Sequence, residues 1–153
     1  MASIPTDWLD FIDCLNGQGV EYVIVGAHAL AFHELPRLTG DMDFLVRPTP
    51  ENSVRVVAAY RDFGFGSLGL KDDEFASLDR IVQIGYPPVR IDVMSSISGV
   101  DFDEVWATRI FGDLGGREVF FMGREALLKN KIASGRPKDM DDAKRLSRLI
   151  KQR

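Results

Sequence analysis

The chain of 153 residues contains a single cysteine and two histidines. Cys14 has no partner within the chain, which excludes an internal disulfide and gives no sign of an oxidising compartment. His28 and His33 are five positions apart, so they do not share a helix face as an i, i+4 zinc pair would. Helix-capping or core roles are the simpler explanation for both, and His28 is the better candidate for a functional role.

Long apolar runs and repeats are also missing, and no leader sequence is expected. No apolar run approaches the roughly 20 residues that cross a bilayer, and residues 1–7 include neither a basic nor an apolar leader region. The glycine-rich stretch 64–69 lacks the lysine of a Walker phosphate loop. We therefore expect a cytoplasmic protein that does not associate with membranes.

Charge is unevenly distributed along the chain. Residues 124–153 contain ten Lys/Arg and four Asp/Glu, a net of +6, whereas the remainder contains nine and nineteen, a net of −10. A basic segment beside an acidic body suits a site that combines metal-binding carboxylates with phosphate-binding cations, although by charge alone a solvated basic helix face is the simpler explanation. The acidic body argues against stable binding of duplex nucleic acid, which needs a broad basic surface.

Hydrophobic periodicity predicts an α/β (α+β) architecture. Apolar residues at helical spacing predict helices at 8–15, 27–33, 50–63 and 124–134, a helical turn at 101–106, and a last helix from Pro137. Within 50–63, the expected buried positions are Val54, Val57, Ala58 and Tyr60. Strands are expected at 21–25, 42–46, 80–84, 89–94 and 117–122. We expect one domain over 1–153, with a small mixed sheet flanked by helices at about 20–122 and a C-terminal helical segment at about 123–153.

Two aspartates interrupt an otherwise apolar strand. Because side chains alternate along a strand, Asp41 and Asp43 point to one face. Adjacent carboxylates on one face repel each other, and a divalent cation relieves that repulsion. Asp92 lies on the polar face of another apolar strand, together with Arg90, which we expect to pair with a carboxylate. If the two strands are neighbours, three carboxylates converge.

Oxygen ligands without nearby histidine or cysteine favour Mg²⁺, or Mn²⁺, over Zn²⁺. A cluster of three carboxylates can hold two such ions, the arrangement that clamps both oxygens in phosphoryl or nucleotidyl transfer. An isolated Asp-x-Asp pair is more often a turn or a solvated strand end. Gly26 supports the interpretation of the acids as a metal site, because a glycine at a strand-to-helix turn brings backbone N–H groups near an anion.

These features together resemble the nucleotidyltransferase superfamily with the DNA polymerase β-like fold, in particular the small bacterial branch of minimal nucleotidyltransferases and AbiEii-type toxins. The resembling residues are Val25-Gly26-Ala27-His28-Ala29, then Arg37-x-Thr39-Gly40-Asp41-x-Asp43, then Asp92 in its apolar strand, and the segment 130–139.

The resemblance implies transfer of a nucleoside monophosphate from an NTP, such as ATP, to an acceptor hydroxyl on a protein, a tRNA end or a small molecule. In such proteins the paired acids and a third acid bind two metal ions, and the third acid can activate the acceptor. Mapped onto this chain, these residues are Asp41, Asp43 and Asp92. The residues with an implied role in nucleotide binding are Gly26, Ala27, His28, Arg37, Thr39, Lys131, Arg136 and Lys138.

The sequence departs from the family pattern at one position. Many members have serine or glycine after the first glycine, and the serine hydroxyl contacts phosphate, whereas this chain has Ala27. The triphosphate is then left to backbone amides, to His28 or to distant cations. This departure favours the alternative of a non-catalytic binding module that acts through a protein partner, as in toxin–antitoxin systems. Retention of all three acids favours the enzyme, whose cleft a partner or a second copy could complete. For Lys131, Arg136 and Lys138 a structural role at helix ends is the alternative to phosphate binding.

Overall fold

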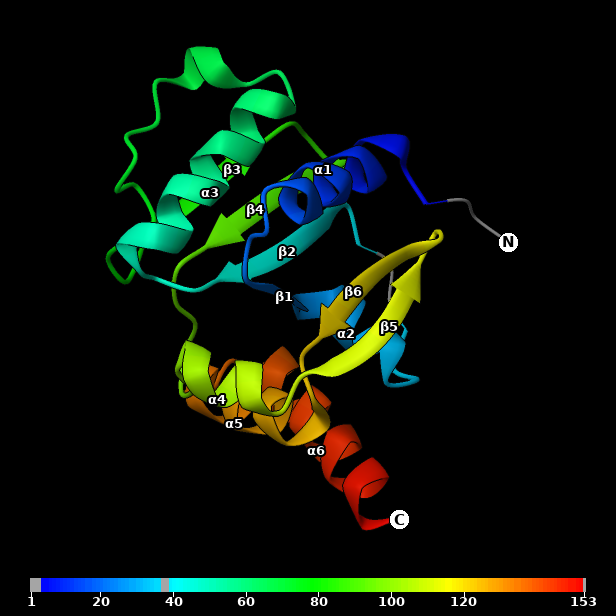
Figure 1. The fold of residues 1–153 in the computed structure, drawn as a ribbon. Coiled ribbons are helices and arrows are strands. Elements are labelled where there is room, and N and C mark those ends of the chain that lie inside the picture. Colours follow the sequence, from blue (N-terminus) through cyan, green and yellow to red (C-terminus); the bar gives the residue numbers. More distant parts are fainter. Residues whose placement is uncertain (1–3, 37–38, 153) are drawn as a thin grey trace.

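The computed structural model of the chain describes residues 4–36 and 39–152. Helices and strands alternate along it (Figure 1). The helices are α1 (Thr6–Gly17), α2 (Gly26–Phe32), α3 (Pro50–Asp62), α4 (Phe102–Ala107), α5 (Arg124–Ser134) and α6 (Pro137–Lys151), with a short 3-10 turn η1 at Gly66–Leu68. The strands are β1 (Tyr22–Val25), β2 (Asp41–Val46), β3 (Ile81–Ile84), β4 (Arg90–Met94), β5 (Ile110–Leu114) and β6 (Arg117–Phe121).

The six strands form one mixed sheet in the order β3-β4-β2-β1-β6-β5. Neighbours β1 and β2, β3 and β4, and β5 and β6 are antiparallel, whereas β2 and β4, and β1 and β6, are parallel. The predicted mixed sheet flanked by helices is therefore confirmed. Strand β5 was not predicted; the sequence indicated only the last strand, now β6.

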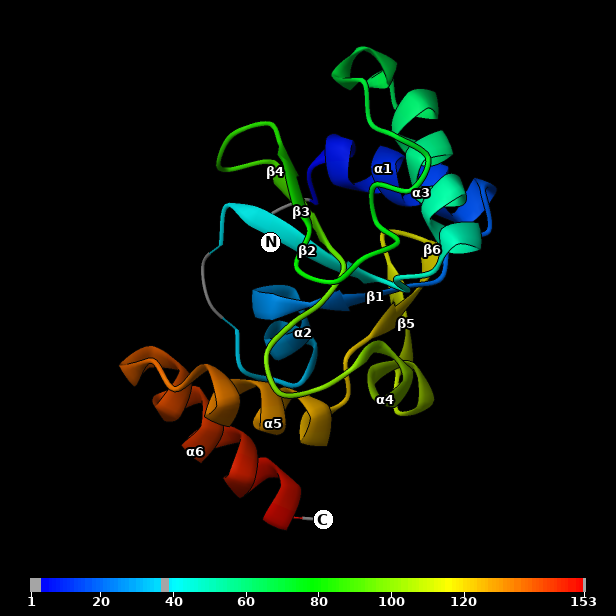
Figure 2. The ribbon, with the colours of Figure 1, turned by 90° about the vertical axis from the view of Figure 1, so that its left-hand side faces the viewer.

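Helices cover both faces of the sheet. Helices α1 and α3 lie on one face, and α4, α5 and α6 lie beyond the other (Figures 1 and 2). The first core packs Phe11 edge-on against Phe44 and Tyr60, at centroid distances of 5.5 and 5.3 Å. The second core includes Val23, Leu127 and Leu146. Each large apolar side chain buried in these cores contributes about 1.5–3 kcal/mol.

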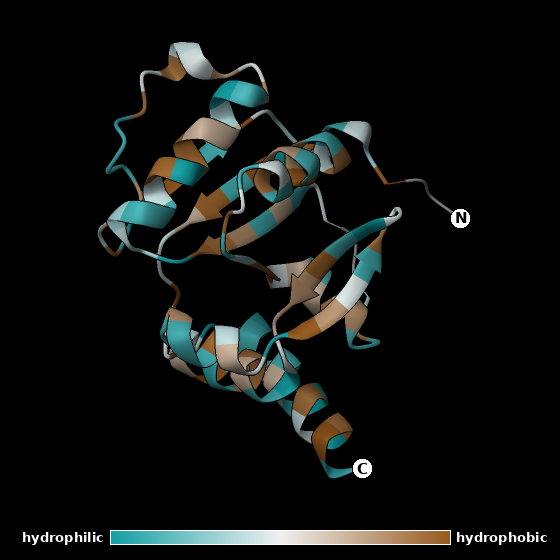
Figure 3. Cartoon of the chain, in the orientation of Figure 1, coloured by the Kyte–Doolittle hydropathy of each residue, from teal (hydrophilic) through white to brown (hydrophobic). Residues whose placement is uncertain are grey.

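Helix α3 is rotated relative to the prediction. Val57 and Tyr60 are buried as predicted, but Val54 is 45% exposed, and Val56 and Ala59 are fully buried instead. Asn52 accepts a hydrogen bond from the Glu21 N–H and donates to the Glu21 and Arg47 carbonyls. These bonds anchor the start of the helix, and hydrophobic spacing alone does not predict them. Figure 3 shows hydrophobic and hydrophilic residues alternating along α3, as expected for an amphipathic helix.

Among the described residues, no helix combines the length and the apolar character that a membrane span requires.

Candidate metal and nucleotide site

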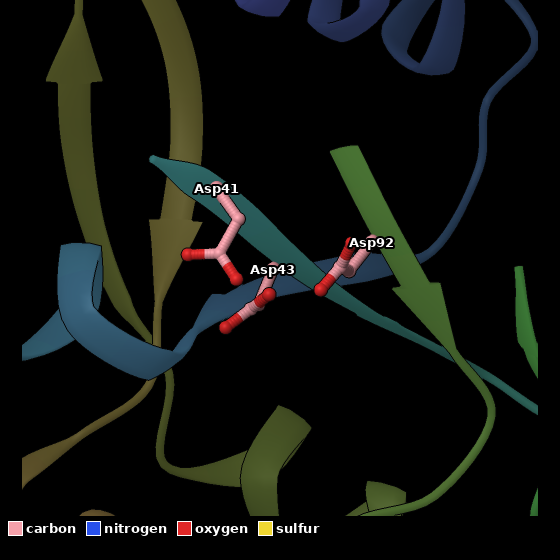
Figure 4. A group of neighbouring side chains, drawn as sticks. All are labelled: Asp41, Asp43 and Asp92. Atoms are coloured by element: carbon pink, nitrogen blue, oxygen red, sulfur yellow. The ribbon is translucent and has the colours of Figure 1, made fainter. Parts of the chain in front are cut away.

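Strand register brings the three aspartates together. In the parallel pair β2–β4, Asp41 lies opposite Arg90 and Asp43 lies opposite Asp92. The three carboxylates point toward one another from these two strands (Figure 4), and one oxygen from each lies within 4.8 Å of the others. The convergence expected from the alternation of side chains is thus confirmed. The donor set consists of hard oxygens, which fits a divalent cation such as Mg²⁺.

Arg90 binds two of the three carboxylates. Its Nε donates to Asp92 Oδ1 at 2.9 Å, and its Nη2 donates to Asp92 Oδ2 at 3.0 Å and to Asp41 Oδ2 at 2.8 Å. The expectation that Arg90 pairs with a carboxylate is confirmed, and the pairing extends to both strands. Because Arg90 and Asp92 are two residues apart on one strand, the same alternation places both on the face of the acids.

Ionisation of Asp43 is disfavoured by its surroundings in the cluster. Burial, together with the neighbouring carboxylates of Asp41 and Asp92, raises the pKa of Asp43 to about 7, against the lowering effect of Arg90. Close carboxylates that cannot all ionise without a cation are typical of metal sites. Asp41, Asp43 and Asp92 would hold a divalent cation here, which would favour the ionised form of Asp43.

Gly26 is required by its distance from Asp43. The residue has φ of +70° and begins α2 directly after β1, whose Val25 is paired with Asp43. A Cβ at this position would collide with Asp43 Oδ2 and would approach Asp43 Cγ to 3.1 Å. The sequence suggested that Gly26 brings N–H groups near an anion; the structure gives it a second role, which is to leave space for the Asp43 carboxylate.

Thr39 holds Asp41 in position. Its hydroxyl donates to Asp41 Oδ1 at 2.6 Å, and it also accepts from the Asp41 N–H at 3.3 Å. Ala27 and Thr39 both line the cleft described next. Arg37, the other loop residue predicted to bind nucleotide, lies outside the described residues.

A cleft of about 640 Å³ joins the acids to the basic C-terminal segment. Its walls include Gly26, Asp41 and Asp43 from the sheet side, and Lys131, Arg136, Lys138 and Asp139 from α5, α6 and the turn between them. This volume falls within the range of small-molecule sites. The structure therefore places carboxylates and predicted phosphate-binding cations around one cavity.

Two of the three cations are engaged by acids. Lys131 Nζ lies 3.3 Å from Asp139 Oδ1 and 3.3 Å from Asp142 Oδ2, and both acids are 1% exposed. Arg136 Nε donates to Asp139 Oδ2 at 2.7 Å. Burial would raise the pKa of Asp139, but the hydrogen bonds from Arg136 and Lys131 outweigh it and hold the pKa below its usual value. Asp139 lies in the first turn of α6, and Arg136 takes the N-cap position of that helix.

Lys138 differs from the other two cations. In the part of the chain that the structure describes, no ion pair involves it, and it is exposed on the cleft wall. Its charge is therefore free for an incoming anion, whereas the charges of Lys131 and Arg136 are largely neutralised.

The buried cluster of Lys131, Asp139 and Asp142 makes a stability prediction. Lys131→Met should lower the free energy of unfolding by about 3 kcal/mol, because it removes a cation from two buried carboxylates. Urea denaturation at pH 7 measures this. Arg145→Gln is the matched control, since Arg145 pairs with Asp141 on the surface of the same helix at 3.4 Å and should cost less than about 0.5 kcal/mol. Equal losses in the two variants would contradict the assignment.

The two histidines have different environments. The ring of His28 meets Trp8 edge-on at a centroid distance of 4.8 Å, and burial lowers its pKa. His28 is not among the residues that line the cleft, so its nucleotide-binding role stays a prediction without support from this packing. His33 takes the C-cap position of α2, and its Nε2 bonds to the Met122 carbonyl at 2.7 Å. The expected capping role is confirmed for His33.

Three polar residues on the cleft wall were not predicted to have a role from the sequence. Ser96 and Ser98 follow β4, and Ser134 ends α5. The run of serines after the strand carrying Asp92 was the available signal, because chain segments that leave neighbouring strands at the same edge border the same cavity.

Comparisons with known proteins find a similar solved structure. No family model matches the sequence, and no curated protein matches it at a significant level. Among solved structures, the chain is similar to a protein from Thermotoga maritima described as a "putative nucleotidyltransferase", with a TM-score of 0.57 and 14% identity over 98% of this chain and 96% of that one. At this identity the match shows the fold, and the chain has a nucleotidyltransferase-like fold.

Proposed function

We propose that this chain is a metal-dependent nucleotidyltransferase that moves a nucleoside monophosphate from an NTP to an acceptor hydroxyl and releases pyrophosphate. The observation that carries the proposal is the cleft in which Asp41 and Asp43 face cations of α5 and α6. Carboxylates that hold a divalent cation, beside cations that hold phosphates, form the minimal equipment for this reaction.

In this proposal, Asp41 and Asp43 hold the metal, with Thr39 fixing the orientation of Asp41. Asp92 is the third ligand, or the base that takes the proton of the acceptor hydroxyl, and Arg90 must then release one of its oxygens. A bound Mg²⁺ or Mn²⁺ supplies positive charge for the triphosphate and for the negative charge that develops during transfer. Both ions suit an oxygen-only donor set.

Lys138 is the proposed partner of the triphosphate, because its charge is unpaired within the described residues and it faces the cleft. Lys131 and Arg136 shape this wall through Asp139. Ala27 contributes no hydroxyl, so Gly26 and its neighbours offer only backbone groups. We expect Lys138→Ala to raise the KM for NTP by about tenfold with a smaller effect on kcat, since a lost contact to ground-state phosphate weakens binding uniformly. An unchanged KM would contradict this role.

The acceptor class follows from resemblance alone: a protein hydroxyl, a tRNA end or a small molecule. We also propose that the chain is related to AbiEii-type toxins and that it acts in the cytoplasm. A protein partner or a second copy of the chain would complete the cleft. If the chain is such a toxin, its expression without a partner protein should stop the growth of the host cells. Expression of the Asp43→Asn variant should not.

Incubation with Mg²⁺, each α-labelled NTP and a cell extract tests the enzyme. Label should pass to an acceptor with the wild-type chain and with Asp72→Asn, a change in an exposed turn, but not with Asp43→Asn. Absence of transfer together with absence of metal-dependent NTP binding would rule out the proposed enzyme activity. The alternative, a binding module with a retained fold, would then stand. The bonds from Arg90 to two of the acids favour that alternative.

A further inference from the structure

Asp92 is fully engaged by side chains of this chain. Its Oδ1 accepts from Arg90 Nε at 2.9 Å, and its Oδ2 accepts from Arg90 Nη2 at 3.0 Å and from Gln83 Nε2 at 3.3 Å. The side chain of Asp92 is only 7% exposed. A guanidinium bound to both oxygens of a carboxylate is a strong, geometrically specific ion pair. A metal ion that used Asp92 would have to break part of this arrangement.

The carboxylate oxygens of Asp41 and Asp43 are more accessible to a metal ion than those of Asp92. Both line the cleft, whereas neither Asp92 nor Arg90 is among the described residues that do. Asp41 has one oxygen on Arg90 at 2.8 Å and the other on the Thr39 hydroxyl at 2.6 Å, and a hydroxyl can turn away when an ion binds. No hydrogen bond from Arg90 to Asp43 is present in the described chain. The accessible oxygens of the cluster therefore belong to the pair on β2.

Arg90 also carries a charge that cannot be removed. Guanidinium stays protonated at all physiological pH values, and a divalent cation within a few ångströms of it is repelled unless both are well screened. Arg90 lies directly opposite Asp41 in the strand register, so its position is fixed by the sheet. Within the cluster it stands where a cation bridging Asp41 and Asp92 would otherwise stand.

We propose that Arg90 acts as a built-in cation of the acidic cluster, so that the free protein binds one divalent ion, between Asp41 and Asp43, and admits a second only after Arg90 leaves Asp92. This rests on the proposed function only in that the cluster binds a divalent cation. It replaces the expectation of two ions in the free protein, and it makes Arg90 a positioning residue that holds Asp92 away from the first ion.

Titration of the full chain with Mn²⁺, followed by calorimetry and by the electron paramagnetic resonance of free Mn²⁺, tests the proposal. The wild type should bind one ion, and Arg90→Gln should bind two, the first about tenfold more tightly, because a repelling charge has been removed. Arg80→Gln is the control, since Arg80 pairs with Glu74 at 2.6 Å and contacts none of the three acids. Asp43→Asn should lose the first ion.

A second measurement uses the wild-type protein and needs no folded Arg90→Gln variant. The ¹⁵N signal of the Arg90 Nε–H, assigned by its loss in Arg90→Lys, should keep its position through the first equivalent of Mg²⁺ and move only at higher concentrations. Movement with the first equivalent would overturn the proposal, as would two ions of similar affinity in the wild type or an unchanged stoichiometry in Arg90→Gln. These three results would leave the metal-dependent enzyme standing. If the wild type binds no Mn²⁺, neither the role of Arg90 nor the metal-dependent enzyme stands.

Discussion

Replacing Asp43 by asparagine should lower nucleotidyl transfer at least about a thousandfold, the scale expected when a metal ligand in such a site is lost. Without divalent cations, the same change should raise the melting temperature. Asp43 is buried among carboxylates, and the neutral amide keeps its size while removing the charge that burial and its neighbours disfavour. A variant that is inactive and yet more stable indicates a site whose function conflicts with its stability.

The pH dependence follows from the raised pKa of Asp43. An acid whose pKa rises from 3.8 to about 7 on folding favours the folded state when protonated, and this stability is lost as pH rises through that interval. In asparagine the charge never forms, so the advantage of Asp43→Asn should grow between about pH 4 and pH 7 and then level off. We expect a gain of about 3–6 °C at pH 8, equivalent to about 1–2 kcal/mol for a chain of this length.

Thermal melts in EDTA at pH 5 and pH 8 measure this gain, with Asp72→Asn as the control. Added Mg²⁺ should narrow the difference, because it stabilises only the wild type. A lower melting temperature for Asp43→Asn at pH 8 in EDTA would show that Asp43 is not under electrostatic strain.

Changing Gly26 to alanine should lower activity at least about a hundredfold and the free energy of unfolding by about 2–4 kcal/mol. Two costs combine here. The positive φ of Gly26 disfavours any side chain, and the new Cβ would collide with the Asp43 carboxylate. Relief of the collision requires movement of Asp43 or of the turn after β1, and either movement displaces the proposed metal ligand.

Gly19→Ala separates the two costs. Gly19 has φ of +67°, nearly the same as the +70° of Gly26, but a Cβ there meets nothing within 4 Å. It should therefore lose only about 1 kcal/mol and retain activity. The double variant Gly26→Ala with Asp43→Ala should recover part of the stability lost by Gly26→Ala, because most of the carboxylate is gone. Equal losses for the two glycines would contradict the contact.

The sequence predicted the site where local periodicity is sufficient. Alternation in the strands places Asp41 and Asp43 on one face and separates Asp92 from Ile91 and Val93, which enter the core. Convergence then needs β2 and β4 to be neighbours in the register that sets Asp43 opposite Asp92. Helices α5 and α6 were predicted because Gly135, with φ of +68°, ends one and Pro137 begins the next.

The sequence could not predict features that depend on register between distant segments. The bond from Arg90 to Asp41 requires the pairing of these two positions across β2 and β4. Strand β5 was missed because Gly112 and Asp113 break its apolar pattern, and it is held by its pairing with β6. The burial of Lys131 between Asp139 and Asp142 likewise depends on the packing of α5 against α6, in a segment whose composition suggested a solvated basic face.

Calorimetric titration of the protein with each NTP, in Mg²⁺ and again in EDTA, measures whether nucleotide binding depends on the metal ion. Divalent cations held by Asp41 and Asp43 at the cleft should make nucleotide binding metal-dependent. We expect binding of at least one NTP in Mg²⁺, no binding in EDTA, and no binding to Asp43→Asn in either buffer. Equal NTP binding with and without Mg²⁺, or binding that survives in Asp43→Asn, would contradict it.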